Sequence, residues 1–139
     1  MALSRNSENY IIMSVIYIEL NDFNYGEKGL STSATNLMYE LIKDNGGDRI
    51  TPYIEDSVNL SLMHYGEIKD AYSASLKDWK WERLPLLTQA ILLMSYTRFY
   101  YIDKPAKAVV IDIAVNLAKQ YIEEKQAKFI HAILDSVLN

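Results

Sequence analysis

The amino-acid sequence predicts an all-α protein, folded as a compact bundle of about seven helices. Half of the 139 residues are hydrophobic, which is enough to form a folded core. The chain has only 5 glycines and 3 prolines, fewer than a turn-rich β protein needs. Apolar residues recur three and four positions apart in most segments, as on one face of a helix. A chain of this length suits one main core, and we find no repeat, linker or low-complexity tract, so we predict a single domain over residues 1–139.

The first predicted helix covers Tyr10–Leu20. Its isoleucines and valines also permit a strand by propensity, but the segment is longer than a usual strand and contains no turn signal. Helix is therefore favoured. Residues 21–32 are rich in Asn, Asp, Gly, Ser and Thr, which predicts a loop.

The second helix is amphipathic, with Thr32 or Ser33 as its N-cap and Gly46-Gly47 as its end. Its apolar residues follow the spacing i, i+3, i+4, i+7 and i+8: Ala34, Leu37, Met38, Leu41 and Ile42.

Thr51-Pro52 predicts the start of a third helix, because proline is favoured at the first helical position after a capping residue. We expect this helix to stop at Gly66. Its apolar stripe contains Ile54, Val58, Leu62 and Tyr65, and a shorter helix follows with Ile68, Tyr72 and Leu76.

The segment Leu84–Tyr101 is apolar on nearly every side, which is typical of a helix at the centre of a bundle. We expect Trp79 to fill the junction between the two halves of that bundle. Pro105 opens the next helix, and Asp103 stands where a negative charge favours a helix N-terminus. The last two helices present these apolar residues: Ile111, Ala114, Ala118 and Tyr121, then Phe129, Ile130, Ile133, Leu134, Val137 and Leu138.

Composition and motifs exclude several classes of function. No enzyme motif is present, and neither His64 nor His131 belongs to a metal-binding pair, so we expect no catalysis, no cofactor and no metal. The absence of cysteine fits a reducing cytoplasm, and no apolar run is long enough to span a membrane. The net charge is −4, whereas a protein that binds nucleic acid without a partner usually has an excess of basic residues. Positive charge must come from a local patch or from a partner.

One segment combines aromatic and basic residues in the way that a nucleic-acid stacking surface requires. It contains Lys119, Tyr121, Lys125, Lys128 and Phe129. A binding patch and an ordinary helix–loop–helix junction are both open interpretations of this segment.

The chain from Leu76 onward resembles the NusB family of bacterial transcription antitermination factors. The resemblance is carried by these motifs, in order and spacing: Leu76-Lys-Asp-Trp79, Glu82-Arg-Leu84, Asp103-Lys-Pro105, Val110–Lys119 and Lys128-Phe129. It implies two helical subdomains around a long central helix, and no catalysis or cofactor. It also implies binding of a boxA-like RNA together with a small-subunit ribosomal protein, called NusE in this role. The pair would join the RNA polymerase elongation complex, so this chain would reach the polymerase indirectly. Monomer and homodimer are both open.

The resemblance also implies site residues, position by position. The RNA-binding residues would be Arg5, Lys119, Tyr121, Lys125, Lys128 and Phe129, and the residues facing the ribosomal protein would be Tyr17 and Glu82. At Lys125 the family carries an acidic residue, so the charge is reversed here.

Other departures from the family remove positive charge. The arginine-rich start of the first helix is Arg5-Asn-Ser-Glu-Asn9 here, and two basic positions of the family fall at Gln89 and Leu93. The family's Asn-Glu pair is Asp112-Ile113. Two hypotheses follow: an antitermination factor that binds RNA with its ribosomal partner, or a diverged protein-interaction module that has lost specific RNA binding.

Overall fold

The computed structural model describes residues 2–24 and 30–139, with side chains for residues 2–22 and 34–139. Over these residues the chain forms seven α-helices, one 3₁₀ helix and no strand, which confirms the predicted all-α class. In chain order they are α1 Arg5–Asn24, α2 Leu30–Asp44, α3 Pro52–Met63, α4 Tyr65–Ser73, η1 Trp81–Arg83, α5 Leu86–Tyr101, α6 Lys107–Tyr121 and α7 Glu124–Val137.

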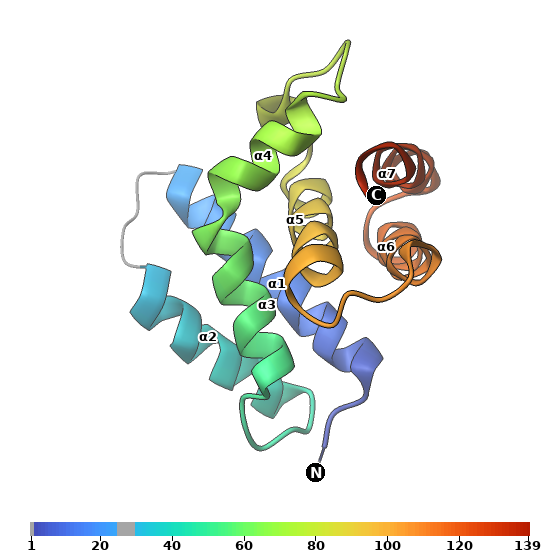
Figure 1. Cartoon of the computed structure of the whole chain (residues 1–139). Helices are drawn as coiled ribbons and strands as arrows, with labels where there is room; N and C mark the ends of the chain where they lie inside the picture. Colours follow the sequence, from blue (N-terminus) through green and yellow to red (C-terminus); the bar gives the residue numbers. More distant parts are fainter. Residues whose placement is uncertain (1, 25–29) are drawn as a thin grey trace.

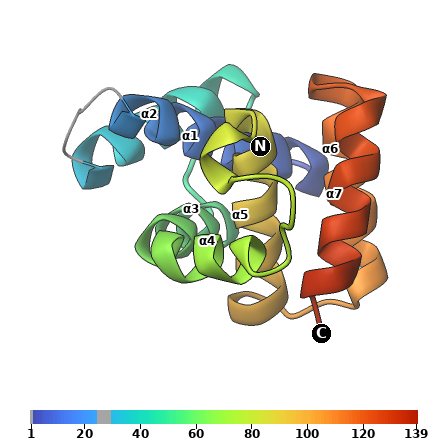
Figure 2. The same ribbon diagram turned by 90° about the horizontal axis from the view of Figure 1, so that it is seen from above.

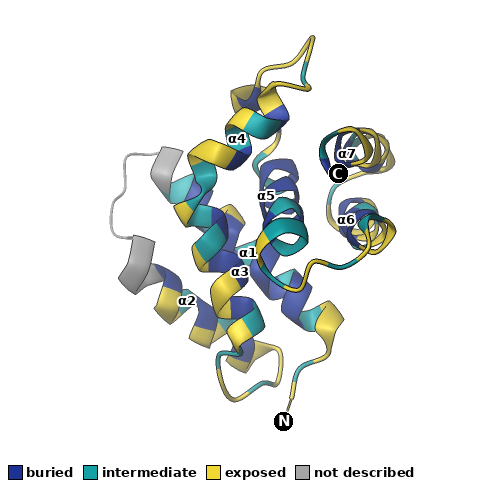
Figure 3. Ribbon diagram, viewed as in Figure 1, coloured by how far each residue is buried: buried dark blue, intermediate teal, exposed yellow. Residues whose placement is uncertain are grey.

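Helix α5 lies at the centre, with α1 to α4 on one side and the α6–α7 pair on the other (Figures 1 and 2). It packs against α1, α3, α4, α6 and α7. Ile91, Leu92 and Leu93 are completely buried, and Figure 3 shows α5 buried along most of its length. The prediction of a central helix from its all-round apolar sequence is therefore confirmed.

Polar side chains buried on α5 all find hydrogen-bond partners, as burial in a low-dielectric core requires. Gln89 donates to the carbonyls of Trp81 and Leu84, each at 3.1 Å. Thr88 donates to the Gln126 side chain at 2.9 Å, so α5 is bonded to α7. Ser61 of α3 donates to Thr97 at 2.8 Å on the opposite side. These bonds fix α5 against both halves of the bundle.

Trp81, not Trp79, fills the junction before α5. The Trp81 side chain is 1% exposed, lies on the Tyr72 ring at 5.9 Å between centroids, and donates its indole N–H to the Tyr65 hydroxyl at 2.9 Å. Trp79 is 57% exposed. The prediction for Trp79 was wrong because only the tertiary packing of α4 against η1 decides which of two nearby tryptophans turns inward.

Two predicted helix boundaries are confirmed. Thr51 caps α3 by accepting a hydrogen bond from the Ile54 N–H at 3.3 Å, with Pro52 in the first position. Helix α2 ends before Gly46, whose φ of 89° is the left-handed conformation that glycine adopts without strain. The Gly47 N–H then donates to the Ile42 carbonyl at 2.8 Å and closes the last turn.

The first two helices are longer than predicted, and α1 begins at Arg5 rather than Tyr10. Residues 21–24 continue α1 and residues 30–32 belong to α2, so most of the predicted 21–32 loop is helical, and 25–29 lie outside the described residues. Thr32 and Ser33 are therefore inside α2 and not at its N-terminal boundary. Residues with weak helix propensity can still continue a helix when the rest of that helix is stabilised by tertiary packing.

Gly66 does not end the third helix. The break between α3 and α4 is at His64, and Gly66 lies in the first turn of α4. One glycine costs about 1 kcal/mol in a helix. Burial of Ile68 and Tyr72 in the same helix outweighs that cost.

Candidate nucleic-acid interface

The corner between α6 and α7 collects most of the predicted RNA-binding residues. Lys119 and Tyr121 occupy the last turn of α6, and Lys125, Lys128 and Phe129 lie in the first turns of α7. Ile122 and Glu123 make the bend, with the Ile122 N–H bonded to the Ala118 carbonyl at 2.8 Å. The packing of α6 against α7 thus places the five residues together.

The basic residues of this corner are exposed. Lys125 and Lys128 have no ion-pair partner among the described residues, and the Lys119 ammonium lies 4.0 Å from Glu124. Phe129 is half-buried and packs on the core, so only part of its ring is accessible. Tyr121 is 38% exposed, with its ring centroid 5.2 Å from that of Tyr10 in α1. The corner can therefore offer cations to phosphates and aromatic faces to bases.

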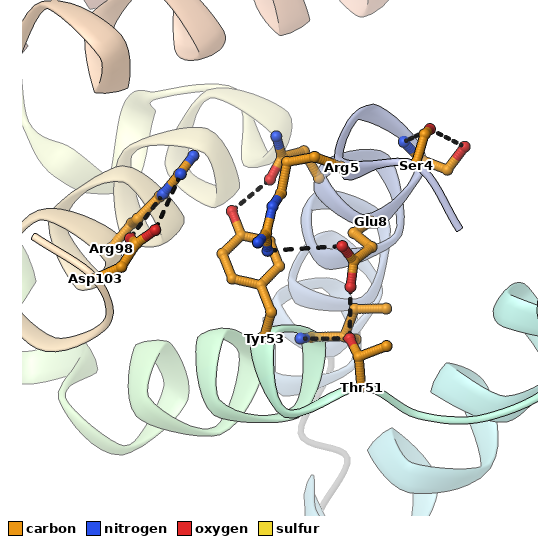
Figure 4. Close-up of polar contacts among 10 residues, drawn as sticks. Ser4, Arg5, Glu8, Thr51, Tyr53, Arg98 and Asp103 are labelled. Carbon is orange, nitrogen blue, oxygen red and sulfur yellow. Dashed lines mark hydrogen bonds and ion pairs between the residues drawn. The ribbon is translucent and has the colours of Figure 1, made fainter. Parts of the chain in front are cut away.

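Arg5, the remaining predicted RNA-binding residue, has a different environment. Its guanidinium lies 3.8 Å above the Tyr53 ring and 3.6 Å from the Glu8 carboxylate. Glu8 is 7% exposed and also accepts a hydrogen bond from Thr51 at 2.5 Å (Figure 4). Since Thr51 caps α3, Arg5 belongs to a network that fastens the start of α1 to the start of α3.

A second arginine lies on the other side of Tyr53. Arg98, near the end of α5, donates two hydrogen bonds to the Asp103 carboxylate, at 3.0 and 3.2 Å, and lies 5.4 Å from the Tyr53 ring centroid (Figure 4). Hydrogen bonding from Arg98 holds the pKa of Asp103 below its ordinary value. Burial raises the pKa of Tyr53, against the opposing effect of the two arginines.

The role predicted for Asp103 was therefore wrong. The aspartate pairs with the arginine that precedes it by five residues and closes the end of α5, and α6 begins at Lys107, two residues after Pro105. Arg98 was not among the residues predicted from the sequence. A clue was present in the spacing, because Arg98 and Asp103 flank the predicted end of an apolar helix.

A groove between the start of α1 and α6 connects the two regions. It encloses about 580 Å³, and Tyr10 and Tyr121 belong to its lining. Five amide side chains also line it: Asn6, Asn9, Asn45, Asn116 and Gln120. The groove was not predicted from the sequence, although Asp112, Asn116 and Gln120 repeat at intervals of four, which places them on one face of α6.

Asn9 is the most deeply buried of these amides, at 2% exposure. Its oxygen accepts a hydrogen bond from the Tyr53 hydroxyl at 2.6 Å, and its nitrogen has no partner among the described residues. A buried amide donor without a partner is costly to the folded state.

A sequence model described as the NusB family matches residues 11–139. The chain belongs to the NusB family. Its relatives include the transcription antitermination protein NusB of Geobacillus kaustophilus, 33% identical over 92 residues, which are 66% of this chain and 71% of that protein. The same-named protein of Macrococcus caseolyticus is 31% identical over 86 residues, 62% of this chain and 65% of the relative, so that match spans just under two thirds of the relative's length.

Solved structures show the same NusB fold. One is a chain in a crystal structure of a plectonemic RNA supercoil, with a TM-score of 0.79 and 21% identity over 96% of this chain and 92% of that one. Another is from the antitermination factors NusB and NusE in complex with double-stranded RNA, with a TM-score of 0.78 and 19% identity over 96% and 95%. Two helical groups around a central helix are therefore the architecture of this chain.

Two positions where the NusB resemblance implied lost positive charge prove to be buried. Leu93 is 0% exposed, and Gln89 is 3% exposed and bonded to backbone carbonyls. Neither side chain faces solvent in this chain. Among the positions where the resemblance implies lost positive charge, the segment Arg5–Asn9 contains exposed ones, such as Asn6.

The two residues assigned to the ribosomal partner are both accessible. Tyr17 lies on α1 and is 37% exposed. Glu82 lies on η1, with its carboxylate 2.6 Å from the Lys69 ammonium. The hydrogen bond from Lys69 lowers the pKa of Glu82, and the same bond raises that of Lys69. A partner that bound Glu82 would have to compete with Lys69.

The described part of the chain offers no other obvious chemistry. No group of three or more His, Asp or Glu side chains there could hold a metal ion. His64 stacks on Tyr101, with 4.6 Å between ring centroids, and His131 is exposed on α7. No helix among these residues has the length and apolarity needed to cross a membrane.

Proposed function

We propose that this NusB-family chain is a non-catalytic, cytoplasmic antitermination factor that binds a boxA-like RNA together with a small-subunit ribosomal protein acting as NusE. The observation that carries the proposal is the α6–α7 corner, where Lys119, Lys125 and Lys128 are exposed beside Tyr121 and Phe129. Relatives named transcription antitermination protein NusB, and a structural neighbour solved with NusE and double-stranded RNA, support the same function.

The ribosomal partner has a physical role in this proposal. The chain has a net charge of −4, and phosphate neutralisation supplies much of the affinity for RNA. Three lysines at one corner offer few phosphate contacts. We therefore propose that the partner supplies the remaining positive charge, and that Tyr17 and Glu82 contact it.

The alternative is a diverged protein-interaction module without specific RNA binding. The environment of Arg5 favours this alternative. Arg5 is the sole cation of the segment Arg5–Asn9, and it already contacts Glu8 and Tyr53 within the protein. RNA binding and partner binding therefore need separate measurements.

The test is an RNA-shift titration with boxA-like RNA, run with and without the ribosomal protein. We expect a weak shift with this chain alone and a stronger one with the partner. Replacing Lys128 and Phe129 by alanine should weaken the shift, while Lys77→Ala, which removes an exposed lysine in the α4–η1 connection, should not. Partner binding without any RNA shift at low salt would reject the first function in favour of the alternative.

The partner contacts are tested by the same proteins without RNA. Tyr17→Ala and Glu82→Gln should each weaken binding of the ribosomal protein and leave the helical content unchanged. Unaltered partner affinity in both variants would show that the partner surface lies elsewhere.

A further inference from the structure

We propose that the groove between α1 and α6 holds one unpaired nucleobase of the bound RNA, with Asp112 accepting a hydrogen bond from an exocyclic amine of that base. The inference rests on the proposed function, because it assumes that RNA reaches this face. It adds a specific ligand group and a basis for sequence preference.

The size and lining of the groove suit a base. Its volume of 580 Å³ falls within the range of about 300 to 1,000 Å³ that is usual for small-ligand sites. Its amides present both donors and acceptors, which match the edges of a nucleobase. Tyr121 stands at its wall and is 38% exposed, so a base can stack there.

The charge of the lining argues against a phosphate as occupant. Among the side chains that line the groove, Asp112 is the one that is charged, and it is negative. A phosphate placed there would meet repulsion and no cation. A neutral base avoids this repulsion, and an amine on that base can donate a charge-assisted hydrogen bond to the carboxylate.

The hydrogen-bonding capacity of the groove is largely unused by the protein. Asn116 and Gln120 are exposed and make no side-chain hydrogen bond within the described residues. Because Asp112, Asn116 and Gln120 share one face of α6, they can contact the same edge of a base.

Phosphate contacts are available next to the groove. Lys119 lies one residue before Gln120 in the last turn of α6, and its side chain is 51% exposed. The groove would then specify a base while the lysines hold the backbone, a division that is general in nucleic-acid recognition. Here the segment Arg5–Asn9 contributes amides where the resemblance implies arginines, so base contacts replace part of the charge.

The first test asks whether Asp112→Ala raises or lowers the affinity for RNA. Removing a negative charge by Asp112→Ala should strengthen RNA binding if Asp112 only repels phosphates. If a base occupies the groove, we expect the opposite: RNA affinity should fall about tenfold, because one good carboxylate-to-base contact is lost. The measurement is fluorescence anisotropy of a labelled single-stranded boxA-like RNA with the chain and its ribosomal partner. Asp70→Ala, an exposed carboxylate on α4, is the matched control and should leave the affinity unchanged.

The second test identifies the base. RNAs in which each nucleotide in turn is abasic should show a loss at one position with the wild-type chain, and no further loss at that position with Asp112→Ala or Asn116→Ala. An analogue that lacks the exocyclic amine at the same position should reproduce the loss. The salt dependence should be unchanged in both variants, because neither removes a phosphate contact.

The outcomes separate the two proposals. Tight RNA binding that Asp112→Ala leaves unchanged or strengthens would overturn the groove and leave the proposed function intact. An abasic profile identical in the wild type and both variants would do the same. Absence of RNA binding by the wild-type chain with its partner would overturn both.

Discussion

The start of α1 and the α6–α7 corner both contain residues assigned to RNA, but the protein uses their charges differently. Arg5 is held by Glu8 and the Tyr53 ring, and Glu8 in turn bonds to the residue that caps α3. Lys125 and Lys128 are exposed without an ion pair in the described part of the chain. The first region fastens helices together, whereas the second is open to a ligand.

This difference shows that an equivalent position does not guarantee an equivalent role. An arginine in a basic cluster has neighbours that repel it and leave it available to phosphates. When the neighbours are Asn6 and Glu8, as here, the same arginine pairs internally. The two regions can therefore be separated by measuring stability and RNA affinity on the same variants.

The largest effect is expected from Glu8→Ala. The substitution removes the acceptor of the Thr51 hydroxyl and the partner of Arg5 in a position that is 7% exposed. We expect the free energy of unfolding to fall by about 2 kcal/mol, measured by urea denaturation. RNA affinity at a temperature where the variant is folded should be unchanged or slightly higher.

The control for that variant is Glu40→Ala, which removes an exposed acid on α2. It should change the stability by less than about 0.5 kcal/mol. A Glu8→Ala protein as stable as the wild type would show that the network at the start of α1 does not fasten α1 to α3.

The next effect is expected at the opposite region, from Lys125→Ala combined with Lys128→Ala. Two fewer phosphate contacts should lower RNA affinity about tenfold and reduce the slope of log K against log salt by about 1.5. Stability should change little, because both side chains are exposed. Combined Lys77→Ala and Lys80→Ala removes the same charge from the connection before η1 and should not alter the slope. Equal losses in the two double variants would show that only overall charge matters.

The helices were predictable where local signals decide them. The Leu84–Tyr101 segment could be placed at the centre because it is apolar on every face, and Thr51-Pro52 marks a helix start by capping chemistry alone. Trp79 and Trp81 could not be separated, because both precede the same helix and only packing against Tyr72 selects one of them.

The site was predictable in part, for a similar reason. Residues 119–129 are close in sequence, so their clustering follows from one helix–loop–helix connection. The groove is different, because Asn9 and Asn116 line it together only once the fold has placed α1 and α6 on its two sides. The pairing of Arg5 with Tyr53 likewise depends on the contact of α1 with α3.

A smaller effect is expected from Arg5→Ala, which tests the two roles of one residue directly. Loss of the contact with the Tyr53 ring and of a half-exposed ion pair should lower the free energy of unfolding by about 0.5 to 1 kcal/mol. RNA affinity should fall less than in the Lys125 and Lys128 double variant. A loss of RNA affinity as large as in that double variant, with stability unchanged, would make Arg5 an RNA ligand and remove the contrast between the two regions.

The smallest effect is expected from Asp103→Asn, and it depends on pH. Arg98 holds the pKa of Asp103 below its ordinary value, so the folded state favours the carboxylate. The stability that the wild type gains over the variant should be fully present above about pH 4, the ordinary value, and should disappear as the pH falls through the lower folded-state pKa. Because Asp103 is partly exposed, the difference at neutral pH should stay below about 1 kcal/mol. Urea denaturation of both proteins between neutral and acidic pH measures it. A difference that persisted unchanged into acid would mean that packing, and not the charge of Asp103, closes the end of α5 beside Tyr53.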